Sequence, residues 1–116
     1  MADLKIDARR EGAIGLVRLS GEARLELIDG LKAAVRRLRT EGAKCVLLSL
    51  KDMTFVDSAS VGAVLELDKE ISAGSGSLVL CAIPVRVAKM LDAMGLSGRL
   101  KIAANEAAGR KACGPA

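Results

Sequence analysis

The sequence predicts an α/β domain, in which a mixed β-sheet of four to five strands packs with about four helices. Short apolar runs alternate along the chain with longer segments in which apolar residues recur every three or four positions. Strands separated by helices in this way are typical of a sheet covered by helices. The 116 residues contain no repeat, low-complexity tract or linker, so we expect one domain over residues 1–116.

The first third of the chain predicts a hairpin followed by a helix. Residues 4–8 alternate apolar and polar side chains, as a half-exposed edge strand does, and residues 13–19 follow a turn as a more buried strand. An amphipathic helix begins near Arg24 and ends before Gly42, a residue suited to the left-handed cap. Gly30 inside this helix should cost about 1 kcal/mol relative to Ala. The apolar face of the helix consists of Ile28, Leu31, Val35 and Leu38.

The middle of the chain predicts two buried strands with a helix between them. Residues 45–50 form a nearly continuous apolar run, which is typical of a strand covered on both faces. We expect a loop over residues 51–56 and a second helix over residues 58–72. A turn then leads to another buried strand over residues 78–82.

The last third predicts a helix, a short strand and a weak terminal helix. Pro84 is suited to open the third helix and Gly95 to end it. Residues 100–102 form a candidate strand, and Asn105 can cap an Ala-rich helix. The final dozen residues bury little, so we expect them to fray. The inward face of the third helix is predicted to hold Val87, Met90, Leu91 and Met94.

The composition argues against an enzyme. There is no His, so a Ser-His-Asp or Cys-His device cannot form, and we expect no catalytic residue and no cofactor. The charged residues 66–70 fit the solvated face of a helix, and the segment 74–76 is too short for a phosphate-binding loop. Phe55 is the only aromatic residue, so the core is expected to be aliphatic.

Composition also bears on metals, nucleic acid and membranes. Cys45, Cys81 and Cys113 form no CxxC pair, and we expect buried, reduced thiols without a metal. A net charge of +4 is mild, and the aromatic platforms that stack on bases are missing, so no nucleic-acid partner is expected. No apolar stretch approaches the length of a membrane span and no signal peptide is visible, which predicts a cytoplasmic protein without membrane insertion.

The start of the predicted second helix is unusually rich in small residues. Asp57 or Ser58 can act as an N-cap, and a purely structural cap is one interpretation of this segment. Ser and Gly weaken a helix, however, so a cap alone does not explain why small residues gather at this point. Small side chains let another backbone approach closely, as a docking face requires. The small residues are Ala59, Ser60, Gly62 and Ala63.

These residues carry a resemblance to a known family. The segment 57–62, Asp-Ser-Ala-Ser-Val-Gly, resembles the Asp-Ser-x-Gly-Leu-Gly signature of the STAS family of anti-sigma-factor antagonists. Residues 19–22, Leu-Ser-Gly-Glu, resemble a turn of that family, and residues 84–96 resemble its third helix and the Gly-Leu that follows. The matches lie in the family's order along nearly the whole chain, which implies a single STAS-like domain.

The resemblance implies a regulatory module. It makes Ser58 the phosphorylation site, modified by an anti-sigma factor that is also a serine kinase with a histidine-kinase-like ATPase fold. The unmodified chain would bind this kinase, phosphorylation would break the complex, and a phosphoserine phosphatase would restore it. The partner-binding residues implied are Gly21, Glu22, Asp57, Ser58, Ala59, Ser60, Val61 and Gly62.

Two departures from the signature leave alternatives open. Ser60 stands where the family usually has Gly, and Val61 stands where it has Leu. We expect the Ser60 side chain at the contact face, where it could narrow partner choice and serve as a fallback phosphorylation site. An alternative function is a non-cycling STAS subunit of a lipid-transport ABC complex or of a stress-sensing scaffold. A further alternative, an aliphatic interior that carries a lipid or nucleotide, predicts a retained ligand, and we expect none.

Overall fold

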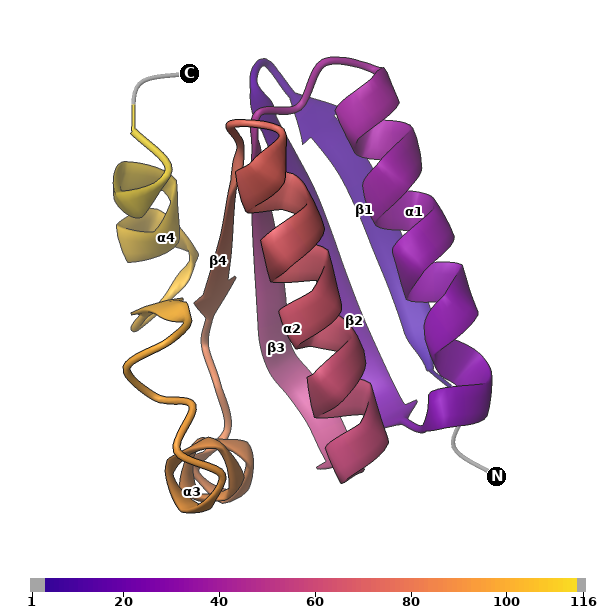
Figure 1. The fold of residues 1–116 in the computed structure, drawn as a ribbon, viewed down its shortest axis with the longest axis vertical. Helices are drawn as coiled ribbons and strands as arrows, with labels where there is room; N and C mark the ends of the chain where they lie inside the picture. Colours follow the sequence, from indigo (N-terminus) through magenta and orange to yellow (C-terminus); the bar gives the residue numbers. More distant parts are fainter. Residues whose placement is uncertain (1–3, 115–116) are drawn as a thin grey trace.

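The computed structural model describes residues 4–114 and shows a five-stranded sheet with helices on both faces (Figure 1). The predicted α/β class is confirmed. The elements in chain order are β1 (Lys5–Glu11), β2 (Ile14–Ala23), the 3₁₀ turn η1 (Leu25–Leu27), α1 (Ile28–Thr40), β3 (Cys45–Val56), α2 (Ser58–Ala73), β4 (Ser77–Cys81), α3 (Val85–Ala93), β5 (Lys101–Ala103) and α4 (Glu106–Ala112).

The strands lie in the sheet in the same order as in the sequence, β1-β2-β3-β4-β5. The β1–β2 hairpin is antiparallel, and the other three pairs are parallel. Parallel neighbours need crossover connections, which α1, α2 and α3 supply. Because such crossovers are right-handed and the strand order never reverses, these three helices pack on one face and leave the other face to α4.

Alternation along the strands divides the apolar residues between two cores. The larger core holds the apolar stripes of α1, α2 and α3 against residues such as Val17, Val46 and Leu48. The intervening strand residues point to the opposite face, because successive side chains of a strand alternate. There they form a smaller group, which we call the second core: Ile14, Leu16, Cys45, Leu47, Val79 and Cys81.

The amphipathic stripe predicted for α1 is confirmed, since each of its four residues is at most 2% exposed. The opposite face of α1 pairs with α2, through Lys32 with Glu66 at 3.2 Å and Arg36 with Glu70 at 2.9 Å. The acidic face of α2 is therefore partly neutralised rather than only solvated. No helix in the described part of the chain is both long and apolar enough to cross a bilayer.

The loop predicted over residues 51–56 is wrong, because β3 continues to Val56. The β3–β4 ladder ends at the pair Ser49–Cys81, so beyond Ser49 the strand pairs with β2 alone. Its second half is consequently more polar and more exposed, and irregularities interrupt its register with β2. Because a strand that pairs on one side only can carry more polar residues, this segment has the sequence pattern of a loop.

One expectation about the last third of the chain is also wrong. Met94 is 40% exposed rather than inward, because α3 ends at Ala93 and Met94 is its C-cap residue. The Asn105 side chain caps α4, as the sequence predicts, and this helix packs on the sheet over Leu47. Fraying of the final dozen residues stays a prediction. Residues 115 and 116 lie outside the described residues.

The expectation of three reduced cysteines is wrong for two of them. Cys45 and Cys113 form a disulfide, with their Cα atoms 5.6 Å apart. Cys81 is a free, buried thiol, as the sequence predicts. The disulfide joins the first residue of β3 to the residue that follows α4, and it closes a sequence separation of 68 residues.

Candidate functional site

The candidate site lies where the carboxyl ends of β2 and β3 meet the start of α2. The register pairs Gly21 with Met53 and Glu22 with Phe55, and the N–H of Asp57 donates to the Ala23 carbonyl at 3.0 Å. The structure therefore brings together the two segments, 19–22 and 57–62, that the sequence analysis singled out. Gly21 has a φ of 92°, a conformation that favours glycine, at one of the irregularities between β2 and β3.

Asp57 is the N-cap of α2 and also holds the chain beyond β2. Its Oδ1 accepts from the backbone N–H of Ser60 at 2.8 Å, and its Oδ2 accepts from the N–H of Leu25 at 3.1 Å. The nearby Ser60 hydroxyl lowers the pKa of Asp57 most, followed by the N–H groups of Ser60 and Leu25 and the charge of Arg24. Asp57 is therefore a stable carboxylate at the helix start.

Ser58 is the first residue of α2, and its side chain is exposed, as is that of Ala59. Gly62 follows about one turn later and is partly exposed, and an added Cβ there would meet nothing within 4 Å. A hydroxyl and small side chains thus lie at one helix end with open space above them. We call Gly21, Glu22, Asp57, Ser58, Ala59 and Gly62 the candidate surface.

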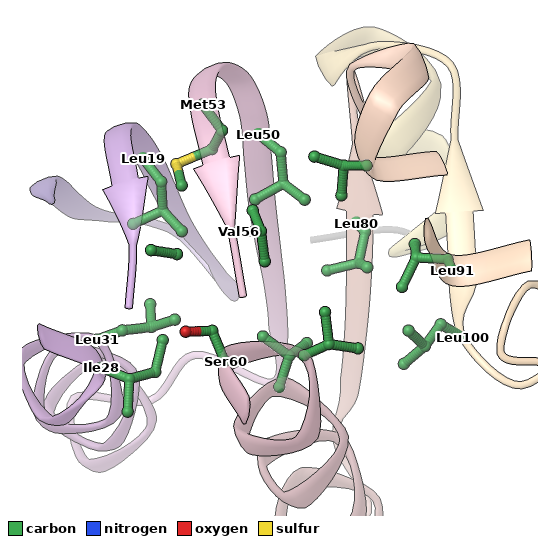
Figure 2. Close-up of a pocket in the computed structure, with 14 residues that line it drawn as sticks. Leu19, Ile28, Leu31, Leu50, Met53, Val56, Ser60, Leu80, Leu91 and Leu100 are labelled. Atoms are coloured by element: carbon green, nitrogen blue, oxygen red, sulfur yellow. The ribbon is translucent and has the colours of Figure 1, made fainter. Parts of the chain in front are cut away.

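Ser60 does not belong to this surface, and the expectation that it lies at the contact face is wrong. Its side chain is 1% exposed and points into the larger core between α1 and α2 (Figure 2). The hydroxyl lies near the Asp57 carboxylate, but its geometry falls short of a hydrogen bond, and it has no partner among the described residues. Val61 is buried too, at 4% exposure. In this conformation the Ser60 hydroxyl is not accessible from solvent.

The Ser60 side chain borders a narrow apolar cavity of about 40 Å³, enough for one water-sized molecule. The other residues that line it are all apolar, and several are labelled in Figure 2. A water there would find Ser60 as its only side-chain partner, whereas buried waters usually make about three hydrogen bonds. The space accommodates the hydroxymethyl group and is far too small for a lipid.

Sequence reasoning missed part of the surroundings. Arg24 binds Glu22 through two nitrogens, at 2.9 and 2.7 Å, and its guanidinium lies 4.6 Å from the centre of the Phe55 ring. Leu25, whose N–H binds Asp57, is an exposed apolar residue, 54% accessible. Phe55 could have drawn attention to these surroundings in the sequence. It is the only aromatic residue, it lies three positions before the start of α2, and aromatic residues are enriched at protein interfaces.

Comparison with known proteins decides the family. The family model described as the STAS domain matches residues 5–109, nearly the whole chain. The chain belongs to the STAS domain family. A curated relative from Paenibacillus polymyxa, named anti-sigma F factor antagonist, is 31% identical over 108 residues, which cover 90% of each chain.

Solved structures of SpoIIAA share the fold. The anti-sigma factor antagonist SpoIIAA in its unphosphorylated form superposes with a TM-score of 0.79 at 21% identity, covering 97% of this chain and 99% of that one. The phosphorylated form of the Bacillus cell fate determinant SpoIIAA gives a TM-score of 0.70 at 20% identity, with coverages of 94% and 98%. At these identities the likeness concerns the fold.

Proposed function

We propose that this STAS domain is an anti-sigma-factor antagonist that binds an anti-sigma factor through the candidate surface and is released when Ser58 is phosphorylated. The observation that carries the proposal is the exposed Ser58 hydroxyl on the first residue of α2, directly after the capping carboxylate of Asp57. The name of the Paenibacillus relative and the existence of a phosphorylated form of SpoIIAA support it.

The isolated fold tolerates a phosphate on Ser58. The phosphate adds about −1.5 to −2 charges at the N-terminal end of α2, where N–H groups of the first turn lack intrahelical acceptors and the helix dipole favours an anion. The Ser58 side chain projects into solvent, so the phosphate displaces no packed group. The modified chain therefore keeps its structure.

A closed interface does not tolerate the same phosphate. The Asp57 carboxylate beside it stays charged, since its pKa is lowered. A partner that covers this end of α2 has to desolvate two adjacent anions, or has to meet them with its own acidic groups. A penalty of about 3–4 kcal/mol weakens binding several-hundred-fold, because each 1.4 kcal/mol is a factor of ten.

The chain supplies the hydroxyl as a substrate, and the phosphoryl chemistry belongs to its partners. We propose that the anti-sigma factor is the serine kinase, with the histidine-kinase-like ATPase fold that the family resemblance implies. A separate phosphoserine phosphatase would return the chain to its binding form. Ser60 is not proposed as a second site, because its side chain is 1% exposed.

The test begins with capture of the anti-sigma factor on the tagged chain, followed by binding and phosphorylation with the purified pair. Ser58→Ala should bind like the wild type and incorporate no phosphate from ATP. Ser58→Asp should bind at least tenfold more weakly in calorimetry. Ser60→Ala is the matched control, since it removes the neighbouring serine and should leave phosphorylation intact.

The outcomes separate the alternatives. Tight binding by Ser58→Asp would overturn the electrostatic part of the proposal, and phosphate on a residue other than Ser58 would overturn the site. A stable complex with an ATPase that yields no phosphoserine in the presence of ATP would instead favour the non-cycling subunit.

A further inference from the structure

The helix α4 covers the second core as a separate unit on the face away from α1, α2 and α3. Its closest neighbours in the sheet are β3, β4 and β5. Gly109 lies directly on Leu47, so closely that an added Cβ would overlap the Leu47 side chain. With α4 in place, Leu47 is fully buried and Cys81 is 0% exposed.

The non-covalent contacts that hold α4 are few. Arg18 binds Glu106 through two hydrogen bonds of 2.8 Å, and Arg110 pairs with Glu11 at 2.8 Å. The side chains of both pairs are between 28% and 44% exposed, and ion pairs at such positions contribute little. The helix has only seven residues, far fewer than an isolated helix needs to be stable in water.

The disulfide is the strongest restraint on this helix. It fixes Cys113, just beyond the last turn of α4, to Cys45 at the start of β3. Of the two bonded cysteines, Cys45 is 4% exposed and Cys113 is partly exposed. A reductant therefore reaches the disulfide from the Cys113 side. Both ends of the bond belong to the second core and its border, not to the candidate surface.

We propose that the Cys45–Cys113 disulfide is a redox-controlled latch, whose reduction releases α4 from the sheet and opens the second core around Cys81. The candidate surface lies at the end of β3 away from Cys45, next to the larger core, and it stays folded in both states. This inference does not depend on the proposed function, because it concerns the opposite face of the sheet.

The redox step needs a thiol reductant, such as glutathione or a protein dithiol. Its thiolate attacks the Cys113 sulfur, the S–S bond breaks, and the electron pair leaves on Cys45, which then takes a proton. A second reductant thiol attacks the mixed disulfide and releases Cys113 as a thiol. In total, two reductant thiols become one disulfide, and the protein gains two electrons and two protons.

The free thiol Cys81 reports the state of the latch. The full chain is prepared with glutathione disulfide or with a phosphine reductant, and the rate at which a maleimide modifies Cys81 is followed by peptide mass spectrometry. We expect modification at least tenfold faster in the reduced chain. The double variant Cys45→Ser/Cys113→Ser should behave like the reduced chain, and it isolates Cys81 as the sole thiol.

Two further measurements distinguish release of α4 from general unfolding. Release of one short helix exposes little surface, so the Cys81 rate in the reduced chain should depend weakly on urea, whereas global unfolding would give a steep dependence. Gly109→Ala should speed modification of Cys81 in the reduced chain further, because the methyl group pushes α4 away from Leu47.

The proposal is overturned by any of three results. Equal Cys81 rates in the oxidised and reduced chains would show that the crosslink does not hold α4. A urea dependence equal to that of global unfolding would show that the disulfide is only a staple of the whole fold. Three modified cysteines after oxidation and denaturation would show that the crosslink does not form.

Discussion

At the scale of single residues, Asp57 connects two segments of the candidate site. Its two carboxylate oxygens bind the first turn of α2 and the residue that opens η1, so one side chain positions both segments beside Ser58. A capping carboxylate is a common structural device. Here the same group also places a fixed negative charge beside the proposed phosphorylation site.

Replacing Asp57 should therefore destabilise the fold by an amount that depends on how many of its two hydrogen bonds are lost. Asp57→Ala removes both hydrogen bonds and should lower the free energy of unfolding by about 1–2 kcal/mol. Asp57→Asn keeps a single carbonyl oxygen, so it can retain one bond and should lose about half as much. Urea denaturation measures both, and Asp52→Ala on exposed β3 is the control, expected within about 0.5 kcal/mol of the wild type. Equal losses for Asp57→Ala and Asp52→Ala would refute the double capping role.

Ser60→Ala should change the free energy of unfolding by less than about 1 kcal/mol. The substitution removes a buried hydroxyl without a hydrogen-bond partner among the described residues, which favours alanine. It also removes the favourable effect of that hydroxyl on the Asp57 carboxylate, so the two contributions offset each other. Thermal unfolding followed by circular dichroism tests this. A loss of more than 1 kcal/mol would mean that the hydroxyl is satisfied after all, most simply by Asp57.

At the scale of elements, the space around each glycine decides whether an alanine there stabilises or destabilises the fold. An alanine methyl at Gly30 in α1 would contact only the tip of Ile6, at 3.4 Å. Gly30→Ala should thus raise the free energy of unfolding by about 0.5–1 kcal/mol, the cost of glycine in a helix.

Gly15→Ala in β2 is the opposite case. Its added Cβ would lie 3.1 Å from Leu38, so the substitution should destabilise the fold. Both values come from urea titrations, and a stabilising Gly15→Ala would contradict the packing described.

Gly62→Ala should stabilise the fold and weaken the complex. Nothing lies within 4 Å of the added methyl group, so α2 gains helix propensity without a clash. A partner that approaches the candidate surface closely would meet this methyl group, and we expect at least threefold weaker binding in calorimetry. Unchanged binding would place the partner contact elsewhere on the domain.

The elements predictable from the sequence were those with a regular apolar period. The stripe of α1 and the apolar run that begins β3 follow directly from residue type. The second half of β3 could not be recognised, because polar residues such as Lys51 and Thr54 are allowed there only by the early end of β4, a property of the assembled sheet. The inward side chain of Ser60 depends likewise on the space that α1 leaves beside α2.

The disulfide was unpredictable for a related reason. Cys45 and Cys113 are separated by 68 residues and meet only because α4 folds back across the sheet. The two segments of the candidate surface were easier to bring together, since the parallel register of β2 and β3 places consecutive carboxyl ends side by side. Local pattern together with the family resemblance thus pointed to the candidate surface, whereas long-range topology determined the crosslink.

At the scale of the whole molecule, acid should destabilise the domain. The pKa values of Asp57, Glu70 and Glu106 are lowered, respectively by Ser60 with backbone N–H groups, by Arg36 and by Arg18. The unfolded carboxyls take up protons near pH 4, before the folded ones do, so this stability is complete above about pH 4–5 and is lost as the pH falls through the folded values.

Urea midpoints at pH 7, 5 and 3 measure this loss. We expect little change between pH 7 and 5 and a clear fall by pH 3. Asp57→Asn should show a shallower fall than the wild type, because it has one linked carboxyl fewer. Parallel curves for the two proteins would assign the acid sensitivity to other groups.

The chain enters and leaves the fold at opposite ends of β3. Lys5 pairs with Ser20, just before the candidate surface, whereas Cys113 is bonded to the first residue of β3 at the other end (Figure 1). A fluorescent protein or tag joined ahead of β1 would emerge at the end of the sheet that carries the candidate surface and would crowd a partner that binds there. The same tag joined after α4 would leave the candidate surface free. An affinity tag for capture experiments is therefore best attached after α4.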